Sequence, residues 1–509
     1  MELSINRQSV TINEIIFNGC AEQSIESDVL LADYCPDIVR ILKCSVQPKI
    51  ESAQLNAGRI IIDGSAQVKV FYCTQENKVF CYRSSVPFQK NIELKHSCED
   101  GIVHVMPKTD YVNCRAVSSR RLEIKGALSL SVKALGSTAE EFVADSHEMG
   151  IQLKKTPYRV NQPMKTGSGV FIVQETLELG YGKPSAAEIL DCRAEAQVSD
   201  FKPIANKVIT KGELQLQLSY YCTEGKLQFL EHSIPVSSIC DIEKMSEDTS
   251  CSAVYQVVEC SAEIQPSPDG ESRRVSVECK IRCDIAAHKM QEYLAVTDCF
   301  STLYESRADL KAVSLAALEK RIEQRHLYRE TITLPEKVTA VGDVWCTVED
   351  IATEWKDEKM LSAVKMNICL LSFDESGSPE LYERTEDIGF EIPTEAAAAG
   401  AMFMGNAYTV SASYGITSSD RLEIRCDLLL HGGIYTVQAY PMLKNIEVDA
   451  ENPKHTRKRS PLTIYYADKG ESVWNIARRY NTVPDSIMEE NNLQQDIMTA
   501  RRMLLIPTM

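Results

Sequence analysis

Residues 462–509 read LTIYYADKGESVWNIARRYNTVPDSIMEENNLQQDIMTARRMLLIPTM, and this stretch has the clearest local pattern in the chain. The β-branched and aromatic residues over 463–466 predict a short strand. After a turn at Gly470, four apolar residues recur at helical spacing: Val473, Ile476, Ala477 and Tyr480. Pro484 suits the first turn of a second helix, and residues 503–506 predict a closing strand. The stretch is therefore predicted to fold as a small βααβ unit.

Three spaced elements of this stretch resemble the LysM domain family: Gly-Glu-Ser-Val-Trp-x-Ile-Ala from Gly470, Asn-Asn-Leu from Asn491, and Leu-x-Ile-Pro from Leu504. The resemblance implies a module that binds N-acetylglucosamine polymers in a shallow groove beside the strand–helix loops. The candidate groove residues are Gly470, Glu471, Ser472 and Asn492. One loop departs from the family pattern, because Ala500-Arg501-Arg502 replaces its usual Pro-Gly-Gln-like turn. Without that glycine the backbone has less freedom to approach a ligand, which argues against sugar binding.

The first 450 residues contain ordered blocks that recur with a period of about 150. One block ends in Ile-Leu-Lys-Cys44 and recurs 148 residues later as Ile-Leu-Asp-Cys192, with a degenerate third copy, Val-Trp-Cys346. A closing block begins at Arg121, Arg274 and Arg421, at spacings of 153 and 147 residues. Self-similarity at a fixed period indicates a repeat architecture.

Apolar residues alternate with polar ones inside these blocks. In the second copy, Gln215 and Gln217 separate Leu214, Leu216 and Leu218. A period of two is typical of a strand with one buried face, and turn residues between pairs of such runs favour antiparallel hairpins. The sequence thus predicts a mainly β fold, with three tandem antiparallel, sandwich-like repeat domains followed by a small α+β LysM domain.

The predicted domain boundaries follow from the repeat period. They are residues 1–157, 158–308 and 309–448 for the three repeats, 449–461 for a basic flexible linker, and 462–509 for the LysM domain. The best helix candidate within the repeats is Ala312–Arg325, where Leu315, Leu318 and Ile322 line one side. That segment is predicted to connect the second and third repeats.

The order of the repeat blocks resembles the SPOCS-type repeat domain of spore-forming Clostridia. Tandem SPOCS repeats followed by a LysM domain are the arrangement of SipL-like spore coat and spore envelope morphogenesis proteins. The resemblance implies a protein of the mother-cell cytoplasm that is recruited to the forespore surface and the spore coat. It also implies that the LysM domain binds a coat morphogenetic ATPase, SpoIVA-like, at that surface.

Composition excludes several other classes of protein. The net charge of −17 argues against nucleic acid as a principal partner, because phosphate binding needs a basic surface. We expect no signal peptide and no transmembrane segment, since the chain has neither a basic start followed by an apolar core nor a sufficiently long apolar run. The eighteen cysteines include no C-x-x-C pair, and Cys279 and Cys283 are spaced for one strand face, so neither a metal nor a cofactor is predicted. The sequence also lacks the phosphate-loop, dinucleotide and nucleophile-elbow motifs, which predicts a protein that is not an enzyme.

Trp474 is the residue on which partner binding is predicted to depend most. It lies at the edge of the apolar stripe, which leaves two interpretations open. Its indole either packs over Ile464 and only closes the small core, or is partly exposed and anchors a protein partner. Arg478, Arg501 and Arg502 are either placed to pair with an acidic patch of that partner or contribute only to solubility.

The leading prediction is a non-enzymatic assembly protein of the developing spore. The alternative is a cell-wall or cortex protein that binds peptidoglycan or N-acetylglucosamine oligomers. A third class, a wall hydrolase, would require turnover of a wall substrate.

Overall fold

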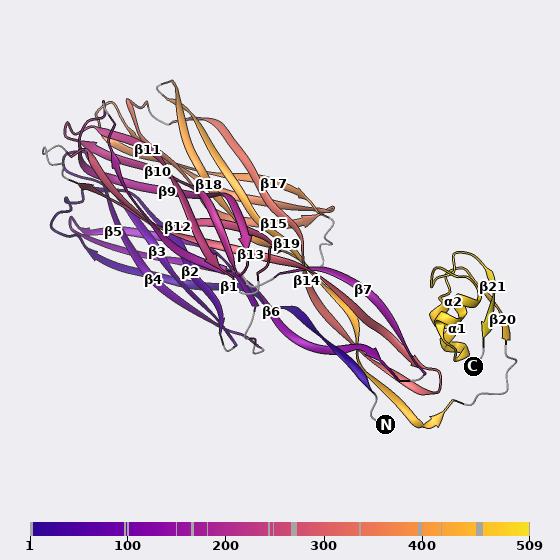
Figure 1. Cartoon of the computed structure of the whole chain (residues 1–509). Helices are drawn as coiled ribbons and strands as arrows, with labels where there is room; N and C mark the ends of the chain where they lie inside the picture. Colours follow the sequence, from indigo (N-terminus) through magenta and orange to yellow (C-terminus); the bar gives the residue numbers. More distant parts are fainter. Residues whose placement is uncertain are drawn as a thin grey trace.

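The computed structural model describes residues 4–507, apart from 57, 96–97, 99–100, 149, 164–166, 181, 243–244, 248, 266–271, 335–336, 395–399, 419 and 455–461. Long antiparallel strands make up most of this part of the chain, and two short helices lie near its C-terminal end (Figure 1). The mainly β prediction is confirmed. Within the described residues, no helix is both long enough and apolar enough to cross a membrane.

One strand order recurs along the chain, first in residues 5–146, the first unit. Its strands are β1 (Ile5–Leu30), β2 (Arg40–Asn56), β3 (Arg59–Cys73), β4 (Val79–Glu93), β5 (Gly101–Ser118) and β6 (Arg121–Ser146). They form two antiparallel sheets, ordered β1-β6-β5 and β2-β3-β4. The first strand of the unit therefore pairs with the last one, and the middle three strands form a meander.

The second unit covers residues 151–301. Its strands are β7 (Ile151–Pro163), β8 (Gly167–Glu178), β9 (Ala186–Ile204), β10 (Lys207–Cys222), β11 (Leu227–Asp241), β12 (Ser250–Gln265) and β13 (Arg274–Ser301). The meander is β11-β10-β9, and the other sheet is β12-β13-β7 with β8 also paired to β13. Because β7 and β8 pair with successive parts of β13, together they take the place that β1 has in the first unit.

The third unit covers residues 304–453. Its strands are β14 (Tyr304–Thr333), β15 (Ala340–Lys356), β16 (Lys359–Phe373), β17 (Pro379–Pro393), β18 (Ala401–Ser418) and β19 (Arg421–Pro453). They form the sheets β14-β19-β18 and β15-β16-β17. The strand order of the first unit is thus present again.

The two sheets of each unit pack face to face and bury apolar side chains between them. In the second unit, Leu214, Leu216 and Leu218 of β10 point inward and face Val277 and Ile281 of β13 within a single cluster. Equivalent clusters lie between the sheets of the first and third units. Alternation with a period of two allows one face of each strand to join this core.

The segment Ala312–Arg325 is a strand, not the helix that its spacing predicted. It lies within β14 and pairs with β19 along its length. Both faces of this part of β14 are covered: Leu315 lies in one apolar cluster, and Leu318, on the opposite face, packs with Leu135 and Met402 in a separate one. Beyond a bulge between Leu318 and Lys320, Ile322 is buried in the core of the third unit, so the three buried residues have a spacing that resembles one helix face.

The ends of the three units also differ from the predicted domain boundaries. The positions 157/158, 308/309 and 448/449 fall inside β7, β14 and β19, because the first and last strands of each unit are longer than the recurring sequence blocks. Residues 449–453 of the predicted linker belong to β19, where Asp449 pairs with Glu305. The rest of the linker, beyond Lys454, lies outside the described residues.

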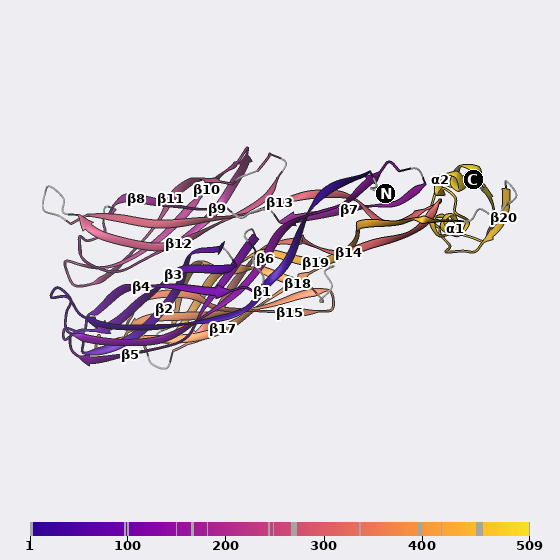
Figure 2. The same ribbon diagram turned by 90° about the horizontal axis from the view of Figure 1, so that it is seen from below.

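Three two-stranded ribbons extend together from one end of the units (Figure 1, Figure 2). We call them the stalk. They comprise residues 5–15 with 135–146, 151–163 with 288–301, and 304–318 with 435–453. Val10 and Phe142 of the first ribbon, Val160 of the second, and Leu315 and Met442 of the third share one apolar core. All three units therefore contribute to the stalk.

The units also contact one another through one recurring position, the residue before Cys44, Cys192 and Cys346. The residue at this position is Lys43 in the first unit, Asp191 in the second and Trp345 in the third. Lys43 Nζ of the first unit lies 2.6 Å from the carboxylate of Glu383 in the third.

At the same position in the second unit, buried Asp191 accepts hydrogen bonds from Lys69 (2.9 Å) and Arg83 (2.6 Å) of the first unit. Burial alone would raise the pKa of Asp191, but the cations Lys69, Arg83 and Arg193 outweigh it and hold the pKa well below its usual range. Arg193 in turn donates to Asp343 of the third unit at 2.7 and 2.8 Å. This charge cluster connects all three units.

In the third unit the position is Trp345. Its ring stacks on Phe71 of the first unit with the centroids 5.4 Å apart, and the Arg193 guanidinium lies 5.1 Å from the ring centroid. An aromatic contact therefore adjoins the charge cluster and buries it further from water.

The remaining elements form the C-terminal domain: β20 (Leu462–Ala467), α1 (Val473–Tyr480), α2 (Pro484–Glu490) and β21 (Arg502–Pro507). The two strands pair antiparallel, and the helices lie between them in sequence. Their shared core comprises Ala467, Val473, Ile476, Ala477, Ile487, Met498, Leu504 and Ile506.

Candidate functional site

Helix α1 of the C-terminal domain is held at both ends by local hydrogen bonds. The Ser472 hydroxyl accepts from the Asn475 N–H at 3.2 Å, which caps the first turn. The backbone N–H of Trp474 donates to the Asp496 carboxylate at 3.0 Å. Asn481 ends the helix in the left-handed conformation, at φ 53°. These caps fix the rotation of α1, and with it the direction of the Trp474 and Arg478 side chains.

Trp474 docks this domain onto the stalk. Its indole Nε1–H donates to Asp298 Oδ2 at 2.8 Å, and its ring meets that of Phe300 edge to face at a centroid distance of 4.8 Å. The side chain is only 6 % exposed. Both contact residues lie near the C-terminal end of β13, within the second ribbon of the stalk.

Arg478, one turn further along α1, reinforces the same contact. Its guanidinium pairs with the Asp298 carboxylate, donates to the Cys299 carbonyl at 3.2 Å and lies 5.6 Å from the Phe300 ring centroid. Lys154 of β7 adds a longer pair with Asp496, at 3.4 Å. We call this set of interactions the docking contact.

Lys454, which follows β19, extends the docking contact. Its Nζ donates to the Ser301 carbonyl at 2.9 Å and to Asn481 Oδ1 at 3.2 Å. The stalk tip is thus connected to both ends of α1.

The structure differs from both interpretations of Trp474 drawn from the sequence. The indole neither packs over Ile464 nor reaches solvent, because Phe300 covers it. Ile464 instead lies on the outer face of β20 and is 59 % exposed. Sequence reasoning missed Asp298 and Phe300, since Asp298 precedes Trp474 by 176 residues and no local pattern marks a contact over that distance.

The other predicted arginines lie apart from the docking contact. Arg501 is well exposed and forms a 3.4 Å pair with Asp468. Arg502 donates to the Asn491 carbonyl at 2.9 Å and so ties the start of β21 to the end of α2. The predicted partner-binding residues are therefore distributed over different sides of the domain.

An apolar face remains exposed on the outside of the two-stranded sheet. Because side chains alternate along a strand, Leu462, Ile464 and Tyr466 of β20 share one face, and Met503 of β21 pairs with Tyr466 on it. Tyr466 is 60 % exposed, and Leu462 and Met503 are exposed as well. We call these four residues the outer face. The opposite side of the same strands, with Ala467, Leu504 and Ile506, lies in the core.

The candidate glycan residues lie in loops whose polar groups already have partners. The Glu471 carboxylate accepts from the Asp468 N–H and the Tyr465 hydroxyl, each at 2.9 Å, and these bonds hold its pKa below the usual value. Ser472 caps α1. Gly470 and Asn492 both have positive φ, 91° and 51°, as tight turns require. These residues are thus brought to the strand–helix loops, where they stabilise the loop conformation.

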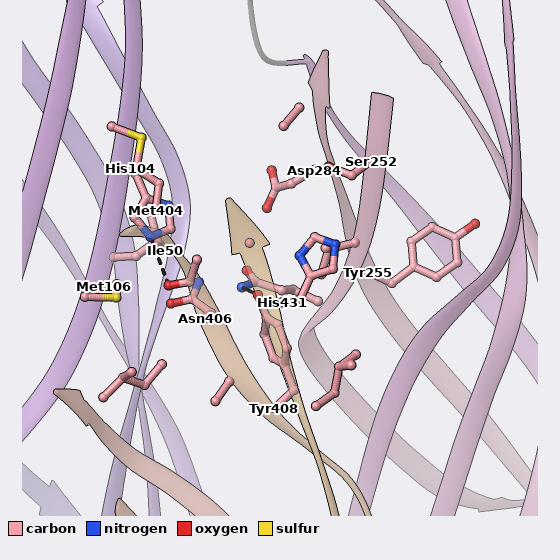
Figure 3. Close-up of a pocket in the computed structure, with 18 of the residues that line it drawn as sticks. Ile50, His104, Met106, Ser252, Tyr255, Asp284, Met404, Asn406, Tyr408 and His431 are labelled. Carbon is pink, nitrogen blue, oxygen red and sulfur yellow. Dashed lines mark hydrogen bonds between the residues drawn. The ribbon is translucent and has the colours of Figure 1, made fainter. Parts of the chain in front are cut away.

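A cavity of about 820 Å³ lies away from this domain, between the three units. His104 of the first unit faces it from one side, Asp284 and Tyr255 of the second from another, and Tyr408 and His431 of the third from between them (Figure 3). No site residue predicted from the sequence lines it.

Burial shifts the ionisation of the cavity residues. It lowers the pKa of His104 to about 4, and the neutral ring donates from Nε2 to the Gly405 carbonyl at 3.2 Å. Burial likewise raises the pKa of Glu195 to about 7, although Lys49 opposes the shift. In the part of the chain that the structure describes, no group of three or more His, Cys, Asp or Glu side chains is placed to hold a metal ion.

Comparison with family models relates these features to known domains. The model described as SipL, SPOCS domain, matches residues 37–117 and 185–265, and the LysM domain model matches residues 465–507. The domain content is that of a SipL-like protein. The two SPOCS matches begin just before β2 and β9 and end in β5 and β12, so each covers the meander and the strand after it. Searches of curated proteins and of solved structures found no match.

The SipL-like domain content confirms the resemblance drawn from the sequence. It indicates a sporulation-related protein that has a LysM binding module. LysM as a domain type suggests peptidoglycan or another carbohydrate as one class of ligand. The docking contact is made by the LysM helix α1 against the unit that carries the second SPOCS match.

Proposed function

We propose that this chain is a non-enzymatic sporulation assembly protein that docks at the forespore surface and binds a coat morphogenetic protein, a SpoIVA-like ATPase, through its LysM domain. The observation that supports this proposal best is the outer face. Four exposed large apolar side chains on one small sheet are costly to leave in water, and such patches mark interaction sites. The helix α1 side of the domain is already occupied by the stalk, so the outer face is the side available to a partner.

The proposal also assigns a role to the repeated units. Their long strands form one stalk, whose tip holds the LysM domain at a distance from the bulk of the units (Figure 2). A scaffold of this form presents the outer face away from the acidic body of the protein. In this proposal the LysM partner recruits the chain, and the three repeated units are carried with it to the forespore surface.

The test uses the full chain with Ile464→Glu and Tyr466→Glu combined, and measures binding of the purified ATPase by biolayer interferometry. Two charges at a central apolar contact are expected to weaken binding by at least tenfold, which corresponds to about 1.4 kcal/mol. Ile497→Glu is the matched control, because Ile497 is an equally exposed isoleucine of the same domain outside the outer face. Wild-type affinity in the double variant would overturn the proposed binding face.

The alternative function is binding of peptidoglycan or N-acetylglucosamine oligomers, which the LysM match supports. Titration of the full chain with chitooligosaccharides, followed by calorimetry, separates the two functions. The internal hydrogen bonds of Glu471 and Ser472 lead us to expect no saturable heat. Saturable binding that Glu471→Gln abolishes would favour the glycan function instead.

A further inference from the structure

Three thiols meet in the core of the second unit. Cys260 Sγ of β12 lies 3.2 Å from Cys192 Sγ of β9 and 3.2 Å from Cys279 Sγ of β13. Strand β9 belongs to one sheet of the unit, whereas β12 and β13 belong to the other. The cluster therefore joins the two sheets, with Cys260 at its centre.

The other units also place thiols across the gap between their sheets. Cys44 of β2 interacts with Cys114 of β5, and Cys346 of β15 interacts with Cys426 of β19. Cys44, Cys192 and Cys346 are the recurring cysteines of the sequence blocks. A thiol at this position thus faces a thiol of the opposite sheet in each unit, and all of these cysteines are free.

In the second unit two pairs of sulfur atoms lie 3.2 Å apart. A disulfide has an S–S length of about 2.05 Å, so a movement of roughly 1 Å between two of the sulfur atoms is enough to form it. Cys260 is partly exposed, whereas Cys192 and Cys279 are fully buried. A small oxidant would consequently reach Cys260 first.

We propose that Cys192, Cys260 and Cys279 form an oxidation site that takes a small peroxide as its oxidant and yields an inter-sheet disulfide. The Cys260 thiolate attacks one peroxide oxygen, the O–O bond breaks, and for hydrogen peroxide the products are Cys260 sulfenic acid and hydroxide, which takes up the thiol proton to give water. The Cys192 sulfur then displaces the sulfenic hydroxyl, which leaves with the Cys192 proton as a second water. Two thiols have lost two electrons in total, and the peroxide has gained them.

Cys279 lets the disulfide move between partners. Its sulfur is close enough to attack Cys260 in the new bond, so Cys192–Cys260 and Cys260–Cys279 disulfides interconvert by exchange. The first closes a loop of 68 residues and the second a loop of 19. Because a disulfide constrains the unfolded chain more when its loop is longer, the inter-sheet Cys192–Cys260 bond is the one that stabilises the folded protein more against unfolding.

The surroundings suit a slow, lasting cross-link rather than a fast sensor. The neighbouring thiols of Cys192 and Cys279, together with burial, raise the pKa of Cys260 well above its usual value. Little thiolate is then present at neutral pH, and the thiolate is the reactive form. Oxidation should therefore need prolonged exposure to peroxide, and the disulfide should persist once it has formed.

The experiment treats the folded full chain with hydrogen peroxide, then blocks free thiols and maps disulfides by mass spectrometry of peptides. We expect the wild type to lose two of its eighteen thiols within the cluster and to yield a peptide that joins residues 192 and 260. Its thermal midpoint should rise after oxidation. Exposed Cys20 reports that the oxidant was active.

Cys260→Ala removes the central thiol, and Cys222→Ala is the control, because Cys222 is a buried cysteine of the same unit outside the cluster. The control should form the cross-link like the wild type. Cys260→Ala should form none in the cluster and should show no oxidation-dependent rise of its midpoint. If Cys20 is oxidised while Cys192, Cys260 and Cys279 of the wild type all remain free, the proposal is overturned. This outcome does not depend on what the LysM domain binds.

Discussion

Asp298→Asn should release the LysM domain from the stalk. The carboxylate of Asp298 accepts from Trp474 Nε1–H and pairs with Arg478. Asparagine keeps one oxygen for the indole but removes the negative charge from both interactions. Hydrogen bonds to a charged group contribute about 1.5–3 kcal/mol, against about 1 for neutral pairs. The Arg478 and Asp298 side chains are 42 % and 26 % exposed, so solvent screening reduces their ionic contribution to about 1 kcal/mol or less.

The expected loss is therefore about 2 kcal/mol, which lowers the ratio of docked to undocked domain roughly thirtyfold. Fluorine NMR of the full chain labelled with 5-fluorotryptophan measures this ratio. The sequence has three tryptophans, so three signals are expected, and Trp474→Phe assigns the relevant one. In Asp298→Asn the Trp474 signal should move and become sensitive to exchange of H₂O for D₂O. The signal of Trp345, buried between units, should stay in place.

Asp485→Asn is the matched control, because it removes the same charge from an exposed position of α2 in the same domain. It should leave all three signals unchanged. An unmoved Trp474 signal in Asp298→Asn, without a solvent isotope effect, would refute the docking contact. So would an equal shift in the Asp485→Asn control.

Two predictions concern the interior of the three units. Asp191→Ala leaves Lys69 and Arg83 without their shared carboxylate, and urea unfolding should show a loss of about 3–5 kcal/mol. The control Asp28→Ala removes an exposed ion pair with Arg121 and should leave the urea midpoint almost unchanged. Because the folded-state pKa of Asp191 is lowered, the carboxylate stabilises the fold above about pH 4, and this stabilisation disappears as the pH falls further. In Asp191→Ala the free energy of unfolding should therefore depend less on pH in the acidic range. Glu195 lines the cavity, with its side chain exposed to that space, and its effect has the opposite sign. Partial desolvation by the surrounding units raises its pKa from 4.5 to about 7, so the stability that it contributes below pH 4.5 is lost as the pH rises through 7. Glu195→Gln should remove that dependence from urea midpoints measured across this interval, and an unchanged profile would show that the carboxyl ionises freely.

Local regularities of the sequence were sufficient for much of the fold. Alternation located the strands of the second unit, because Leu214, Leu216 and Leu218 must face one side of β10. The stripe from Val473 to Ala477 likewise marked the buried face of α1. The same reasoning failed over 312–325, where both faces of the strand are buried, Leu315 on one and Leu318 on the other, which gave a strand the spacing of a helix. Periodicity identifies buried positions but does not distinguish a strand buried on both faces from one face of a helix.

The candidate site could be predicted only in part for a different reason. The LysM motifs are local and named Trp474, but the partner of Trp474 within the chain is set by how the stalk ribbons pack. Asp298 and Phe300 occupy an ordinary strand end, with no motif around them. The outer face, by contrast, follows from alternation along β20, which places Ile464 and Tyr466 on the same side.

The degenerate positions of the repeats are the ones that fix how the units fit together. Before the recurring cysteine stand Lys43, Asp191 and Trp345, and each meets a different neighbour. A lysine in place of Asp191 would bring four cations together in a buried position, because Lys69, Arg83 and Arg193 already surround it. The units therefore share a strand order but cannot exchange places. It follows that only the second unit presents Asp298 at the stalk tip, so divergence between repeats is what gives the LysM domain a single docking position.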